Sequence, residues 1–189
     1  MSTLDYLKMP FSAHGAWDKL STVHPAVWKT LLSLVLPLSL IPPAMLMYAG
    51  AHHPEVYWMS ATPQRFQMIA ALFLVAELCT VPLMAQAIKT IAEAHQVRVE
   101  FRDTLMLSAI SAVPMWLSAL ALAIPSLLLT VSLLVLGLLA ALMLLFQGST
   151  TILKISNEME AQEVCSQAYA VGALVWTLLC VFVKLSLMA

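Results

Sequence analysis

Residues 104–146 read TLMLSAISAVPMWLSALALAIPSLLLTVSLLVLGLLAALMLLF and contain no Asp, Glu, Lys or Arg. As one helix this stretch would be about 64 Å long, whereas the hydrocarbon core of a membrane is only about 30 Å thick. One crossing therefore cannot hold it. Because proline interrupts a helix, Pro125 and Ser126 divide the stretch into a hairpin of two spans, 104–124 and 127–146.

Three further apolar segments, 30–48, 66–88 and 168–187, are long enough to cross a membrane. The composition agrees, because the chain is 61% hydrophobic and 10% charged, whereas a soluble domain carries roughly 25% charged residues. The sequence thus predicts an all-α integral membrane protein, a single domain over residues 1–189 with five transmembrane helices. Pro37, Pro42 and Pro43 are expected to kink or break the outer half of the first span.

Lysine and arginine are divided unequally between the two sides of this arrangement. Because cytoplasmic loops are enriched in these residues, the N-terminus is expected in the cytoplasm and, with five spans, the C-terminus outside. Tyr57 and Trp58 are then expected at the outer interface. The cytoplasmic side carries Lys8, Lys19, Lys29, Lys89, Arg98, Arg102 and Lys154, and the outer side carries Arg65 and Lys184.

Residues 1–28 form the lead-in to the first span. Within it, residues 4–23 mix large apolar side chains with Lys8, Asp18 and Lys19. This pattern is typical of an interfacial helix lying on the cytoplasmic leaflet. An ordered lead-in that packs on the bundle is the alternative interpretation.

Small residues indicate where the spans pack against one another, because close approach of helices drives association in lipid. The third span carries a stripe of hydroxyl groups, and the fourth and fifth spans each carry a pair of small residues four positions apart. We interpret them as packing faces within the chain, with a dimer seam as the alternative. The candidate packing residues are Ser108, Ser111, Ser118, Gly137, Ala141 and Gly172.

Glu77 lies near mid-depth in the second span. A carboxylate at this depth costs about 2.5–3.5 kcal/mol on insertion scales, which the apolar residues of the segment offset. Such a residue is a candidate functional site by default, able to carry a proton or bind a cation. The alternative is a neutral, hydrogen-bonded carboxylic acid that fixes helix packing. Thr80 and Met84 continue the same helix face.

Recognisable catalytic or cofactor motifs are lacking. No Ser/His/Asp or Cys/His set falls at a common depth, and the five glycines form no phosphate-binding loop. The short run His52, His53 and Glu55 is interpreted as a polar loop rather than a metal site. With a net charge of −1, nucleic acid is not an expected partner. We therefore expect a protein that is not an enzyme and has no cofactor or metal.

Three stretches of the sequence follow a known pattern. They are Pro10 and Trp17 with VLPLSLIP at 35–42, SAVP at 111–114, and LLFQGSTTILKI at 144–155. In layout and prolines the chain resembles the Yip-domain family of multispanning membrane proteins, as a compact, bacterial-type member. Many bacterial-type members have a proline shortly after the glycine of the third stretch, where this chain has Ser149 and Thr150 after Gly148.

The resemblance implies a membrane location and partners within the membrane. Eukaryotic relatives lie in Golgi and endoplasmic-reticulum membranes, bind Rab GTPases and shape vesicle traffic. They usually carry a longer N-terminal region with an acidic-aromatic Gly-Pro motif, whereas this chain has about 28 residues there and no such motif. Its compact size is similar to the bacterial branch, which implies the bacterial inner (plasma) membrane.

Two functional hypotheses follow. The first is a non-enzymatic membrane protein that organises membrane-protein partners or lipids, with contacts at Trp17, Arg98 and Arg102 and at the loop 89–103. Its partners would be membrane lipids, other membrane proteins or further copies of the chain. The alternative is a small-solute, ion or proton transporter or channel in which Glu77 is the intramembrane site.

Overall fold

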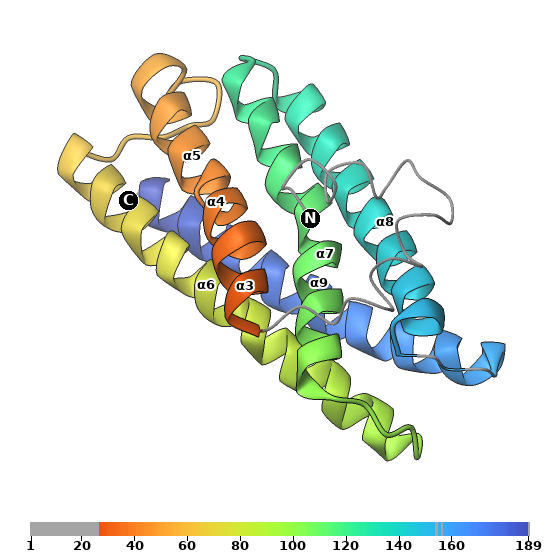
Figure 1. The fold of residues 1–189 in the computed structure, drawn as a ribbon. Coiled ribbons are helices and arrows are strands. Elements are labelled where there is room, and N and C mark those ends of the chain that lie inside the picture. The colour runs from red at the N-terminus through yellow and green to blue at the C-terminus, as the bar shows by residue number, and fades with distance from the viewer. Residues whose placement is uncertain (1–26, 154, 156, 189) are drawn as a thin grey trace.

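The computed structural model describes residues 27–153, 155 and 157–188, and over this part of the chain it is helical without strands (Figure 1). Five helical segments are long and apolar enough to cross a membrane, which confirms the predicted all-α bundle. The predicted interfacial helix within residues 1–28 falls almost wholly outside the described residues. The five segments are Val27–His52, Pro63–Ala94, Phe101–Ala123, Leu127–Thr151 and Glu158–Met188.

The first span is built from four short elements. These are α3 (Val27–Thr30), the π-helical turn η2 (Leu31–Val35), α4 (Leu36–Ser39) and α5 (Ile41–His52), with a turn at Leu40 between the last two. Pro37 and Pro42 lie in the first turns of α4 and α5, where a missing amide hydrogen removes no helical hydrogen bond. The break predicted from the prolines is thus present, at Leu40.

The remaining spans are longer. They are α6 (Pro63–Ala94), α7 (Phe101–Ser118) with its 3₁₀ extension η3 (Ala119–Ala123), α8 (Leu127–Thr151) and α9 (Glu158–Met188). The predicted hairpin is found at 124–126, where the Ser126 hydroxyl accepts a hydrogen bond from the Leu129 amide at 3.4 Å. Asn157 Oδ1 likewise accepts from the Met159 amide at 3.1 Å, which satisfies one amide at the start of α9.

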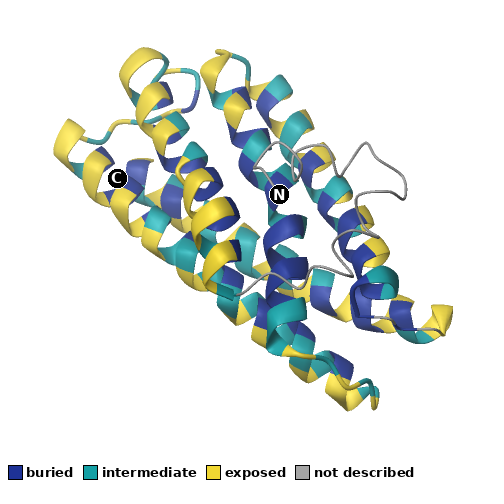
Figure 2. Ribbon diagram, viewed as in Figure 1, coloured by how far each residue is buried: buried dark blue, intermediate teal, exposed yellow. Residues whose placement is uncertain are grey.

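Helix α7 is the central helix of the bundle. In the most apolar part of this span 61% of the residues are buried, whereas in the most apolar part of α9 only 11% are buried. It packs against both α6 and α8, and α9 packs against α6 and α8 in turn (Figure 1). Exposed residues lie on the outer faces of the bundle (Figure 2), and many of them are large and apolar, as expected for surfaces that contact lipid. On α8 the exposed large apolar residues are Leu127, Leu128, Val131, Val135, Leu136, Leu139, Met143 and Phe146.

Polar contacts connect the loop between α5 and α6 to the rest of the bundle. The Tyr57 hydroxyl donates to the Ile124 carbonyl at 2.8 Å and lies 3.1 Å from Thr130 Oγ1. Lys184 of α9 donates to the Tyr57 carbonyl, and its ammonium lies 5.1 Å from the ring centroid of Trp58. Both residues were expected at the outer interface. Trp58 is exposed, whereas Tyr57 is buried and its hydroxyl group bonds inside the protein.

Candidate functional site

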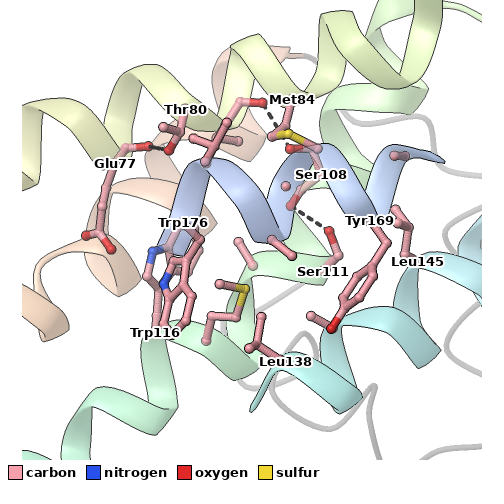
Figure 3. A pocket seen from close by; sticks show the side chains of 18 of the residues that line it. Glu77, Thr80, Met84, Ser108, Ser111, Trp116, Leu138, Leu145, Tyr169 and Trp176 are labelled. Atoms are coloured by element: carbon pink, nitrogen blue, oxygen red, sulfur yellow. Dashed lines mark hydrogen bonds between the residues drawn. The ribbon is translucent and has the colours of Figure 1, made fainter. Parts of the chain in front are cut away.

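A cavity of about 110 Å³ lies between α6, α7, α8 and α9 (Figure 3). Its walls are mainly apolar, with a few polar groups, a combination typical of small-molecule sites. It has room for several water molecules or a small organic group. The polar and aromatic residues that line it are Glu77, Thr80, Ser108, Ser111, Trp116, Tyr169 and Trp176.

Glu77 brings a carboxyl group into this apolar region. The residue is 5% exposed, and its Oε2 atom has no hydrogen-bond partner. The indole of Trp116 lies beside the carboxyl group (Figure 3). An unsatisfied polar atom in an apolar interior is costly and uncommon in folded proteins. Glu77 is therefore a buried acid with one oxygen that the described residues leave without a partner.

Three of the four hydroxyl groups in the cavity lining, those of threonine and serine, already donate their protons to backbone carbonyls. Thr80 Oγ1 donates to the Glu77 carbonyl at 2.9 Å, and Ser108 Oγ donates to the Val81 carbonyl at 2.9 Å. Ser111 Oγ donates to the Ser108 carbonyl at 3.0 Å. A hydroxyl group has one proton and two lone pairs. These groups can therefore only accept further hydrogen bonds.

Two of the predicted packing residues, Gly137 and Gly172, lie close to a neighbouring helix. A Cβ atom added to Gly137 of α8 would come within 3.1 Å of both the Pro114 carbonyl oxygen and Ser118 Cβ of α7. A Cβ atom at Gly172 of α9 would lie 3.2 Å from Cε of Met84 on α6. Ala141 is buried in the cavity wall on α8. Small residues thus permit close approach of α8 to α7 and of α9 to α6.

The Yip1 domain model matches residues 8–183. The chain belongs to the Yip1-domain family. The resemblance seen in the sequence is thereby confirmed, and the match includes all the residues that line the cavity. No curated protein and no solved structure matches the chain. The five apolar spans and the family together identify a membrane protein of Yip1-domain type.

The sequence interpretation missed the aromatic wall of the cavity in this Yip1 domain. Trp116 comes from α7, and Tyr169 and Trp176 come from α9 (Figure 3). A signal was present, because Tyr169 and Trp176 are seven residues apart and so occupy one face of a helix. That the two α9 rings line the same cavity as Glu77 depends on the packing of α9 against α6, which hydropathy does not specify.

Two of the predicted partner contacts, Arg98 and Arg102, are not among the residues that line the cavity. Arg98 is exposed in the α6–α7 loop, and Arg102 donates to Glu100 at 3.1 Å at the start of α7. Trp17 lies outside the described residues. Over the described part of the chain, no group of three or more His, Cys, Asp or Glu side chains is placed to hold a metal ion.

Proposed function

We propose that this Yip1-domain protein is a non-enzymatic membrane protein that organises membrane-protein partners or lipids. The supporting observation is the loop 95–100, a segment with exposed polar side chains at one end of an otherwise apolar bundle. His95 of this loop lies 3.5 Å from a Glu163 carboxylate oxygen and 3.4 Å from Gln167 Nε2, both on α9. In this loop Arg98 and Glu100 are exposed to the surroundings.

The proposed location is the bacterial inner membrane, with the loop 95–100 in the cytoplasm. The described cations support this orientation. Lys89, Arg98 and Arg102 lie at the end of the bundle that carries this loop, whereas Arg65 and Lys184 belong to the opposite end. Because short cytoplasmic loops are rich in Lys and Arg, the α6–α7 end is assigned to the cytoplasm. Labelling of single cysteines introduced at Arg98 and at Glu55 with an impermeant reagent tests the assignment.

The organising function is tested by native mass spectrometry on protein excised from its own membrane in nanodiscs. Wild type is compared with the double variant Arg98→Ala/Arg102→Ala, and Arg65→Ala is the control at the opposite end. A protein or lipid held in fixed stoichiometry by wild type and Arg65→Ala, but lost from the double variant, supports the proposal. Unchanged capture in the double variant contradicts the role of this loop.

The alternative function is transport of a small solute, an ion or a proton with Glu77 as the intramembrane site. It is supported by the unpartnered Oε2 of Glu77 beside a cavity within the spans. Proton and potassium flux into liposomes, measured for wild type and Glu77→Gln, tests it. Equal flux in the two proteins removes this alternative.

A further inference from the structure

The cavity between α6 and α9 contains an acidic group for which its walls supply no counter-charge. Among the described residues that line it, none is Lys, Arg or His. Lys184, one helical turn beyond this wall on α9, is engaged with the Tyr57 carbonyl and the Trp58 ring. When ionised, the Glu77 carboxylate thus has no cation among the described lining residues, and a cationic guest would supply the charge whose absence is strongly disfavoured.

The hydrogen-bonding capacity of the cavity points in the same direction. The hydroxyl protons of Thr80, Ser108 and Ser111 are used by backbone carbonyls, and Glu77 Oε2 is a free acceptor when ionised. The lining also contains donors, the indole N–H groups of Trp116 and Trp176 and the Tyr169 hydroxyl. The free acceptor at Glu77 Oε2 is matched by a primary ammonium group, which has three N–H donors.

Aromatic rings complete the environment. Trp116, Tyr169 and Trp176 line the cavity, and their ring faces attract a cation that is removed from water. The remaining lining is aliphatic, from residues such as Leu138, Leu145 and Leu179. These walls suit a cation with an apolar stem better than a hydrated metal ion.

We propose that this cavity is a binding site for a primary ammonium group carried on an apolar stem. Glu77 would accept from the ammonium, Trp116 and Trp176 would lie beside the charge, and the aliphatic residues of the cavity would surround the stem (Figure 3). This assignment goes beyond the organising function and does not depend on it. Two kinds of ligand carry such an ammonium group: a free alkylamine and an aminophospholipid with its headgroup amine. The free amine fits better, because the lining offers no cation for a phosphate.

The test uses the full chain in nanodiscs made only of phosphatidylcholine, which has no primary amine. n-Butylammonium is titrated while tryptophan emission is recorded, since Trp116 and Trp176 line the cavity. n-Butanol is the neutral probe of the same stem, and sodium chloride tests for a metal-ion site. Glu77→Gln removes the charge, and Glu93→Gln makes the same change at an exposed position of α6.

The expected result is saturable binding of n-butylammonium to wild type and Glu93→Gln, weakened at least tenfold in Glu77→Gln. Should Glu77→Gln fail to fold, Gly172→Val is used instead. The added valine side chain extends toward Met84 in the cavity wall, and this variant retains Glu77. Tenfold weaker binding is again expected. Unchanged n-butylammonium binding in either folded variant overturns the proposal. So does equal binding of n-butanol, or a sodium-dependent emission change that n-butylammonium does not displace.

A parallel sample in nanodiscs containing phosphatidylethanolamine identifies the source of the amine. One phosphatidylethanolamine retained per protein in native mass spectra, and lost in Glu77→Gln, assigns the site to the lipid headgroup and supports ammonium recognition. n-Butylammonium binding without retained phosphatidylethanolamine assigns it to a free amine. These readouts are independent of partner capture by the α6–α7 loop, so failure of one proposal is distinguishable from failure of the other.

Discussion

Ser108 on α7 donates a hydrogen bond of 2.9 Å to the carbonyl oxygen of Val81 on α6, and both residues are buried. This bond links the two helices at the wall of the cavity. Hydrogen bonds between transmembrane helices contribute on average about 0.6 kcal/mol and at most about 1.7 kcal/mol. The bond thus makes a small contribution to the stability of the contact between α6 and α7 at this point.

Ser108→Ala is expected to lower the free energy of unfolding by about 0.6–1.7 kcal/mol, because the bond is lost with little change of packing volume. Denaturation in mixed micelles measures the effect. Ser111→Ala is the matched control, since its hydroxyl bonds only within α7. An equal loss of stability in the two variants would show that the bond to α6 has no special role.

Glu77→Leu is expected to raise the free energy of unfolding by about 1–3 kcal/mol, because an apolar side chain replaces a buried acid with an unsatisfied oxygen. Binding of n-butylammonium should disappear in the same variant. Thermal unfolding in detergent measures the stability. A protein that becomes less stable would instead indicate that Glu77 serves mainly to fix helix packing.

Gly137→Leu is expected to destabilise the bundle by about 1–3 kcal/mol, because overpacking forces neighbouring groups to move. The obstacles are the Pro114 carbonyl and Ser118 Cβ, both 3.1 Å from an added Cβ atom. Gly137→Ala should have a smaller effect in the same direction. Val135→Leu, on the exposed side of α8, is the control and should leave the melting temperature unchanged.

Tyr57→Phe is expected to loosen the end of the bundle where α5, α7 and α8 meet. The variant loses the bond to the Ile124 carbonyl and the contact with Thr130, and one lost buried hydrogen bond costs about 1 kcal/mol. Hydrogen exchange of residues 53–62 and 124–130 should accelerate. Tyr48→Phe, which removes the hydroxyl group from an exposed tyrosine of α5, should exchange as wild type does.

The five spans could be predicted from the sequence because each one depends on a continuous run of apolar residues. The length of residues 104–146 required a hairpin, and Pro125 marked its position, which the structure places at 124–126. The break near Leu40 followed in the same way from Pro37 and Pro42. Glu77 stood out because of the free-energy cost of a carboxylate at mid-depth.

The cavity could not be predicted because it depends on contacts between helices far apart in sequence. Hydropathy says that α9 is a span, but it does not say that Trp176 lines the same cavity as Glu77. Nor does it reveal that the Tyr57 hydroxyl reaches Ile124 rather than a lipid headgroup. These relationships arise from side-chain packing, which a hydropathy pattern leaves open.

The cavity takes its last wall from α9, and this has a consequence for biosynthesis. Chains are made from the N-terminus, so Glu77 enters the membrane before Tyr169 and Trp176 have been translated. During that interval its carboxyl group lacks the partner helix that later covers it. A nascent chain halted before α9 should therefore be a preferred target of membrane quality control. Insertion of the final span is the step that buries the Glu77 carboxyl group.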